Sequence, residues 1–104
     1  MPTVSVIIHT FNNEKFIAET VESVLRQTYN DYEIIVVDDG SEDGTRNALL
    51  PYMQDIRYHY KENGGIASAK NAGISLSNAE FVAFLDHDDL WVPDKLKIQM
   101  EHFN

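Results

Sequence analysis

Apolar and polar residues alternate along this chain in blocks that predict strands and helices in turn. Strands are predicted over Thr3–His9, Tyr32–Val37, Ile56–Tyr60 and Phe81–Leu85. The first block is rich in β-branched residues, which are stiff at χ1 and favour a strand over a helix. The third block alternates polar and apolar residues and indicates a less buried strand, whereas the fourth is apolar throughout and predicts a buried one.

The segments between and after these strands carry apolar residues at helical spacing. Helices are predicted over Glu14–Thr28, through Ala48, Leu49, Tyr52 and Met53, over Ile66–Leu76 and over Asp94–Phe103. We expect Asn12 or Asn13 to cap the first helix, and Pro51 to kink or shorten the second. Gly73 lies inside the third helix, which is predicted in spite of it.

Strands that alternate with helices predict an α/β fold, in which a parallel sheet carries helices on both faces. Right-handed crossovers connect such strands, and ligands bind outside their carboxyl ends. The 104 residues contain no internal repeat and no linker, so one domain is expected.

Composition and net charge exclude several classes of protein and of partner. With 43% hydrophobic and 24% charged residues, the chain has the balance of a soluble globular protein, and no apolar run approaches the roughly 18 residues that span a bilayer. Met1-Pro2-Thr3 has no basic region, so no signal peptide is expected, and the absence of cysteine suits a reducing compartment. A formal charge of −9 argues against nucleic acid as a partner. We expect a cytoplasmic chain, or one peripheral at the membrane in the full-length protein.

The acidic residues are concentrated in two clusters, each directly after an apolar block. The clusters comprise Asp38, Asp39, Glu42 and Asp43, then Asp86, Asp88 and Asp89. Because the carboxyl ends of parallel strands meet at one edge of a sheet, both clusters should converge there. Like-charged carboxylates repel one another unless a positive group holds them.

The second cluster contains an Asp-x-Asp pattern, Asp86-His87-Asp88. Two carboxylates at i and i+2 in extended chain point the same way and could share a hard cation, Mg²⁺ or Mn²⁺. The alternative is an Asx turn that leads toward Pro93.

In the first cluster, adjacent Asp38 and Asp39 suit recognition of a donor edge, such as the N–H of a uracil or the hydroxyls of a ribose. The alternative is a turn in which Ser41, Asp43 or Thr45 caps the second helix.

Two other side chains are open to a functional or a structural reading. His9 at a strand end could be a ligand or a proton carrier, although a lone histidine there is more often structural. Lys70, on a helix after a Gly-Gly loop, could meet a phosphate or could simply be solvated. Trp91 is expected to be a packing anchor.

Neither a Gly-x-Gly-x-x-Gly nor a Walker pattern is present, which argues against dinucleotide binding and NTP hydrolysis.

Four segments together resemble the successive motifs of the family 2 glycosyltransferases, which have the GT-A fold. They are VSVIIHTFN (Val4–Asn12), VVDDGSEDGT (Val36–Thr45), ENGGIASAKNAGI (Glu62–Ile74) and FLDHDDLWVPDKL (Phe84–Leu96). The resemblance covers essentially the whole chain in the order and spacing of the family. It implies the N-terminal half of that fold, a Rossmann-like parallel sheet with strand order 3-2-1-4.

The resemblance also implies a site for a nucleotide sugar, most simply a UDP-sugar, with Mn²⁺ or Mg²⁺ as cofactor. The residues it marks for the nucleotide sugar are His9, Thr10, Asn12, Asp38, Asp39, Lys70, Asp86 and His87. Asp39 would accept a hydrogen bond from the base, and Asp38 would support its loop or the ribose side. Asp88 would be the direct metal ligand, together with Asp86. His9 departs from the family, which usually has proline there.

Family members run to roughly twice this length, so the resemblance implies a donor-binding part without the half that would carry the saccharide or lipid-linked acceptor. That half would also supply the general base of an inverting transfer, and we expect no catalytic base in these 104 residues. The alternative is a non-catalytic module that binds a nucleotide sugar. A phospho-acceptor signalling domain is less favoured, because it needs an acidic pair where this chain has His9-Thr10.

The order 3-2-1-4 leaves the fourth strand at an edge of the sheet. Phe81–Leu85 has no charge, proline or glycine to protect that edge. We therefore expect a homodimer or larger oligomer, unless the last helix, with Leu96, Met100 and Phe103, folds back over the surface.

Overall fold

Strands and helices alternate along the chain as the apolar pattern predicts. The computed structural model describes residues 2–86 and 89–103. Its elements are β1 (Val4–Thr10), α1 (Ile17–Leu25), β2 (Tyr32–Asp38), α2 (Thr45–Leu49) with a 3-10 turn (Leu50–Tyr52), β3 (Arg57–Tyr60), α3 (Ile66–Leu76), β4 (Phe81–Asp86) and α4 (Lys95–Phe103). The predicted α/β class is confirmed.

Within the described residues the strands form one sheet in the order β3-β2-β1-β4, with every neighbouring pair parallel. This is the predicted order. β1 and β2, at the centre, are buried almost throughout, whereas β3 is largely exposed.

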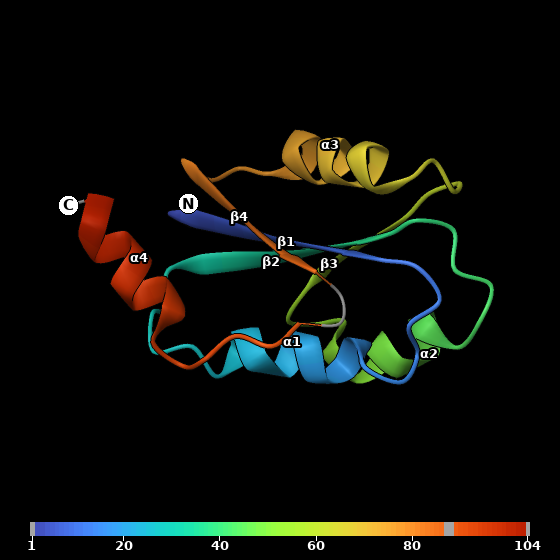
Figure 1. Cartoon of the computed structure of the whole chain (residues 1–104), viewed down its shortest axis with the longest axis horizontal. Coiled ribbons are helices and arrows are strands. Elements are labelled where there is room, and N and C mark those ends of the chain that lie inside the picture. The colour runs from blue at the N-terminus through green and yellow to red at the C-terminus, as the bar shows by residue number, and fades with distance from the viewer. Residues whose placement is uncertain (1, 87–88, 104) are drawn as a thin grey trace.

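Helices cover both faces of the sheet, with α3 on one face and α1 and α2 on the other (Figure 1). Strand residues alternate between these faces, so the core divides in two. The larger cluster includes Val6, Ile8, Val36, Val21 and Leu96, and the smaller joins Ile7, Ile35 and Val37 to Ala69 of α3. No helix in the described part of the chain is long and apolar enough to cross a membrane.

The start of α1 differs from the prediction. The helix begins at Ile17, and its N-cap position is Phe16, which makes no side-chain cap hydrogen bond. Asn12 has a φ of 49°, in the left-handed region that asparagine tolerates better than most residues. Its amide oxygen instead accepts a hydrogen bond from the Glu42 N–H (2.8 Å). The prediction that Asn12 or Asn13 caps α1 is therefore wrong.

β4 is less buried than an uninterrupted apolar run predicts. Only Leu85 is fully buried, while Val82 and Phe84 are 38% and 42% exposed. The reason is its place at the edge of the sheet, where among the described residues it pairs with β1 alone. Other expectations hold: α2 ends two residues before Pro51, and Trp91 packs against the larger core cluster.

Candidate functional site

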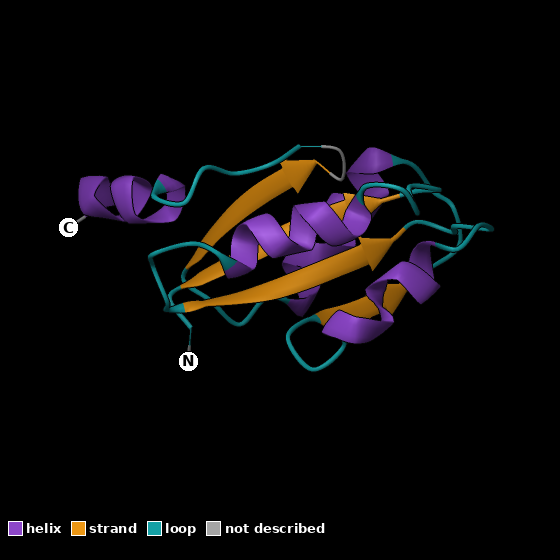
Figure 2. Ribbon diagram, turned by 90° about the horizontal axis from the view of Figure 1, so that it is seen from below, coloured by secondary structure: helices purple, strands orange, loops and turns teal. Residues whose placement is uncertain are grey.

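The carboxyl ends of the strands meet at one edge, as predicted. The parallel register sets Thr10 of β1 beside Asp38 of β2, which is itself beside Tyr60 of β3, and His9 of β1 beside Asp86 of β4. Figure 2 shows the arrowheads of the strands pointing the same way. Asp38 and Asp39 of the first cluster and Asp86 and Asp89 of the second therefore lie at the same end of the sheet.

A pocket of about 390 Å³ opens at this edge. Its lining residues come from the ends of β1 and β2, from the loop after β3 and from α3: His9, Thr10, Phe11, Asp39, Asn63, Gly65, Ile66 and Ala69. The volume lies within the range typical of small-molecule sites. Phe11 and Ile66 are 43% and 63% exposed, so the pocket offers apolar surface beside one buried carboxylate.

Asp39 supplies that carboxylate and holds the loop that forms one wall of the pocket. Its Oδ1 accepts hydrogen bonds from the Gly64 N–H and from Lys61 Nζ, both at 3.0 Å, and its Oδ2 accepts one from the Gly65 N–H at 2.9 Å. Burial alone raises the pKa of the Asp39 carboxyl, but the bonds from Gly64, Lys61 and Gly65 outweigh it and keep the pKa below its usual value. Asp39 is therefore a charged acceptor at neutral pH.

Two glycines allow this loop to approach β2. Gly65 has a φ of +94°, in the region that favours glycine. Gly40 also has a positive φ, and a Cβ there would lie 2.8 Å from the backbone nitrogen of Asn63. The close passage of the two loops explains how the Asp39 carboxylate reaches the N–H groups of residues 64 and 65.

Asp38 is fully buried and is used within the fold. Its Oδ1 accepts from the Ser41 N–H (2.8 Å), and its Oδ2 accepts from the Tyr58 hydroxyl (2.6 Å). Burial and the hydrogen bond to Asp38 both raise the pKa of the Tyr58 hydroxyl, which remains a donor. Of the two roles predicted for Asp38, these contacts are those of support for the loop.

The rest of the first cluster fixes the loop between β1 and α1. Asp43 accepts hydrogen bonds from the backbone N–H of Thr45, the first residue of α2, and from that of Glu14. The Asn12 N–H donates to the Ser41 hydroxyl. The N-cap position of α2 is Gly44, without a side-chain cap hydrogen bond, so none of Ser41, Asp43 and Thr45 caps the helix as the structural alternative had it. Asp43 still binds the first residue of α2, and Asn12 joins the two loops.

A second cavity, of about 510 Å³, lies at the end of β4. Asp86 and Lys70 both line it, together with Asp89 and Lys95. Lys70 Nζ lies 5.0 Å from the centre of the Phe84 ring, and His9 Nε2 lies 3.5 Å from Asp86 Oδ1. His9 lines the first pocket and contacts a residue of the second, so the two hollows are neighbours. His87 and Asp88, also predicted for this site, lie outside the described residues.

A divalent cation suits the acids at this end of β4. In the described part of the chain, no three His, Asp or Glu side chains gather as a metal site would require. However, Mg²⁺ and Mn²⁺ commonly take only one or two carboxylates and complete their shell with water and substrate phosphates. The Asp86 side chain is 57% exposed at the edge of the sheet, and a hard oxygen ligand there fits such an ion.

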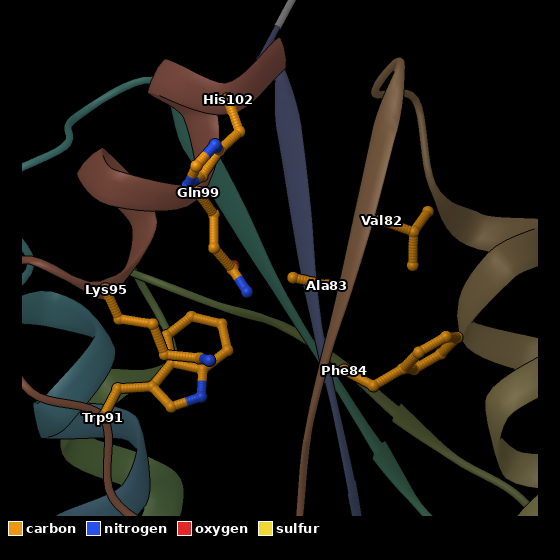
Figure 3. Close-up of a pocket in the computed structure, with 7 residues that line it drawn as sticks. All are labelled: Val82, Ala83, Phe84, Trp91, Lys95, Gln99 and His102. Atoms are coloured by element: carbon orange, nitrogen blue, oxygen red, sulfur yellow. The ribbon is translucent and has the colours of Figure 1, made fainter.

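A further hollow of about 490 Å³ separates β4 from α4 and contains none of the predicted site residues (Figure 3). Ala83 and Trp91 line it, with Lys95, Gln99 and His102 on the side of α4. It lies along the edge strand rather than at the carboxyl ends of β1 and β2.

The predicted site residues did not include several that line the first pocket, namely Phe11, Asn63, Gly65, Ile66 and Ala69, nor Lys61, which binds Asp39. The clearest available signal was electrostatic, because converging acids required a positive partner and Lys61 supplies it for Asp39. Phe11 stands between two residues that were predicted, Thr10 and Asn12.

Comparison with known families gives one match to almost the whole chain. The sequence model described as glycosyl transferase family 2 matches residues 5–104. An uncharacterized glycosyltransferase of Rickettsia typhi is 46% identical over 103 residues, which cover 99% of this chain and 32% of that protein. The UDP-Glc:alpha-D-GlcNAc-diphosphoundecaprenol beta-1,3-glucosyltransferase WfgD of Escherichia coli is 39% identical over 100 residues, or 93% of this chain and 39% of that protein.

Solved structures give the same fold. TarS of S. aureus in complex with UDP superimposes with a TM-score of 0.88 at 30% identity, over 95% of this chain and 31% of that one. TarS has also been solved with UDP-GlcNAc. The mannosyltransferase PcManGT of Pyrobaculum calidifontis, in complex with GDP-Man and Mn²⁺, gives a TM-score of 0.76 at 32% identity, over 86% of this chain and 28% of that one. The chain spans well under half the length of the curated relatives it matches.

Proposed function

The chain belongs to glycosyl transferase family 2, and we propose that it forms the part of a glycosyltransferase that binds the nucleotide-sugar donor. One observation carries the proposal: a pocket with a buried, charged acceptor adjoins a cavity lined by Asp86 and Lys70 at the carboxyl edge of the sheet. A nucleobase fits the first and a diphosphate the second.

In this proposal the base enters the pocket beside Thr10 and Asp39. Asp39 accepts a hydrogen bond from a ring N–H, and the exposed face of Phe11 packs against the base. Uracil has such an N–H, and TarS, which shares the fold, binds UDP and UDP-GlcNAc. We therefore propose a UDP-sugar as the donor.

The diphosphate lies toward Asp86 in this proposal, with Mn²⁺ or Mg²⁺ held by Asp86 and Asp88. Lys70 lines the same cavity and supplies positive charge for the phosphates. When bound, the metal neutralises the charge that develops on the leaving nucleoside diphosphate. PcManGT, which has this fold, was solved in complex with GDP-Man and Mn²⁺.

The sugar would pass to an acceptor bound elsewhere in a longer protein, by an inverting transfer whose general base lies outside residues 1–104. WfgD is named for a diphosphoundecaprenol acceptor, which supports a saccharide or lipid-linked acceptor. We place the reaction in the cytoplasm, at the membrane surface if the acceptor is lipid-linked. The 104 residues alone are then expected to bind the donor without transferring the sugar.

The first prediction concerns nucleotide and metal together. Calorimetric titration of the chain with UDP, GDP and CDP should show the tightest binding for UDP, and Mn²⁺ should strengthen it at least several-fold over EDTA. The physical reason is the repulsion between a diphosphate and Asp86 when no cation lies between them. Equal UDP affinity in EDTA and in Mn²⁺ would contradict the metal site, and no binding of any nucleotide would contradict the proposed function.

The second prediction separates the two cavities. Asp88→Ala should abolish the gain from Mn²⁺ and leave the affinity in EDTA equal or slightly higher, because one repelling carboxylate is removed, whereas Asp39→Asn should weaken UDP in both conditions. Asp55→Ala, which removes an acid just before β3 at the opposite edge of the sheet, is the matched control and should change neither. If Asp39→Asn reduced only the metal-dependent part, the assignment of base and metal to separate cavities would be wrong.

A further inference from the structure

Lys61 makes the only side-chain ion pair of Asp39 in the part of the chain that the structure describes. Its Nζ lies 3.0 Å from Asp39 Oδ1 and also donates to the Glu62 carbonyl at 2.7 Å. The Lys61 side chain is 20% exposed and that of Asp39 is 8% exposed, so water screens the pair little. The Lys61 N–H in turn donates to the Asp38 carbonyl, which fixes the backbone of Lys61 to the end of β2.

The hydrogen bonds to Asp39 leave one acceptor position open. Each carboxylate oxygen can accept about two hydrogen bonds. Among the residues that the structure describes, Oδ1 already has two donors, Lys61 and Gly64, whereas Oδ2 has only the Gly65 N–H. Asp39 lines the pocket, so its Oδ2 can accept a further hydrogen bond from a ligand there. Lys61 meanwhile holds the same carboxylate by Oδ1.

An ionised carboxylate can only accept a hydrogen bond, but a protonated one can also donate. Uracil presents an N–H at ring position 3, whereas cytosine presents a lone pair there. Charged Asp39 thus favours uracil and repels cytosine at this position, and protonated Asp39 could bind either. Because Asp39 is charged at neutral pH, its preference for uracil there depends on whether its Oδ2 is held toward the base.

From this geometry we propose that Lys61 is a positioning residue that holds the Asp39 carboxylate by Oδ1, with Oδ2 turned to accept from the base, and thereby sets the preference of the pocket for bases with a ring N–H. The inference rests on the proposed function and adds the residue that determines base specificity. Other charged groups nearby do not replace Lys61. Asp38 is bonded to Ser41 and Tyr58, and His9 lines the pocket but contacts Asp86.

The test compares the wild-type chain with Lys61→Met, which keeps the length of the side chain without its charge, and with Lys61→Arg, which keeps the charge. Calorimetry in EDTA gives the affinities for UDP and CDP between neutral pH and about pH 4, near the ordinary aspartate pKa. Carbon NMR of the ligand-free chain follows the titration of the Asp39 carboxyl directly. Lys97→Met, which removes an exposed lysine of α4, is the charge-matched control. The titrations of the diphosphate and of cytosine N3 are properties of the ligands, so they are common to all variants and cancel in the comparison.

We expect Lys61→Met to weaken UDP at neutral pH by up to roughly tenfold, the contribution of the charge-assisted hydrogen bond between Asp39 and the base, which is misaligned when Lys61 no longer holds Oδ1, with little change for CDP. Its preference for UDP should disappear at a higher pH than in the wild type, in step with a raised Asp39 titration. Lys61→Arg and Lys97→Met should both behave as the wild type.

A Lys61→Met chain that keeps the wild-type UDP-to-CDP ratio and pH profile would overturn the inference while leaving the proposed function intact. Equal loss of UDP and CDP with an unchanged Asp39 titration would also overturn it, because the effect would then be general. A wild-type chain that binds no nucleotide would instead refute the proposed function.

Discussion

At the scale of single residues, the role of an acidic side chain depends on the hydrogen-bond donors around it. Asp38 and Asp39 are adjacent and both buried, but Asp38 is bonded to Ser41 and Tyr58 within the fold, whereas Asp39 faces the pocket with an acceptor position to spare. The acidic pattern placed both at the edge of the sheet, and only the family resemblance gave them different roles, Asp39 for the base and Asp38 for its loop or the ribose side. The two acids differ because neighbouring side chains along an extended chain point in opposite directions. Their partners Tyr58 and Lys61 also lie about twenty residues further along the sequence.

Glu33 shows the same principle at the opposite end of the strands, and it allows a prediction for stability. Its carboxylate accepts hydrogen bonds from the Ser5 hydroxyl, the Asn78 N–H (3.1 Å) and Arg57 (3.1 Å). Burial raises the pKa of the Glu33 carboxyl, but these bonds outweigh burial and lower it below its ordinary 4.5. Because the Glu33 pKa is lower in the folded than in the unfolded state, the ionised carboxylate stabilises the fold at pH values above the unfolded-state pKa. This contribution is lost as the pH falls through the folded-state pKa.

Glu33→Gln should therefore lower the free energy of unfolding by about 1–3 kcal/mol at pH 7. The difference from the wild type should shrink steadily once the pH falls below about 4.5. Urea denaturation at a series of pH values measures it, with Glu101→Gln, at an exposed position of α4, as the control. A gap between wild type and variant that stayed constant into acid would show that the charge of Glu33 is not what stabilises the fold.

At the scale of elements, the spacing of apolar residues was sufficient to predict the bounds of a helix where its packing follows the local sequence pattern. The bounds of α3, Ile66–Leu76, are those that apolar spacing predicts. The start of α1 could not be read in this way, because the loop before it is held by residues about thirty positions later: the backbone N–H groups of Asn13 and Glu14 bind Thr45 and Asp43. Contacts of this kind depend on the pairing of strands, which a local pattern does not contain.

Gly73 illustrates an element-scale constraint that overrides helix propensity. It is buried in α3, and a Cβ there would lie 2.4 Å from Cγ2 of Ile7 in β1. The methyl group of Ile7 is buried in the smaller core cluster and cannot turn away, so the helix itself must move. Glycine at this position thus permits close packing of α3 on the sheet.

Gly73→Ala should destabilise the fold by about 1–3 kcal/mol, the usual cost of overpacking, which exceeds the gain of about 1 kcal/mol in helix propensity. Asn71→Ala, at an exposed position of the same helix, should be neutral or slightly stabilising. Midpoints of urea denaturation compare the two variants. If both were stabilised alike, α3 would have room to shift and the close approach to Ile7 would not limit it.

At the scale of the whole molecule, the strand order places two very different strands at the edges of the sheet. β3 carries Arg57, a charge of the kind that discourages pairing with another chain. Phe81–Leu85 of β4 has no charge, and among the described residues β4 pairs only with β1. Its outer backbone N–H and C=O groups form a template for a further strand.

The last helix covers only part of this surface. Leu96 and Met100 of α4 are buried in the larger core cluster, on the side of β4 where Ala83 lies. Figure 3 shows Val82 and Phe84 extending to the other side of the strand. Both are more than one third exposed, so an apolar strip remains along β4.

We therefore predict that the 104-residue chain associates through β4 into a homodimer or larger oligomer at micromolar concentration. Light scattering after size exclusion measures the mass. Val82→Lys adds a charge to the exposed side of the strand and should shift the chain toward monomer, because pairing would bury that charge. Ile98→Lys makes the same change at a 53% exposed position of α4 and should leave the mass unaltered. A wild-type monomer would show that the edge is protected, and an oligomer dispersed by Ile98→Lys but not by Val82→Lys would place the contact on α4.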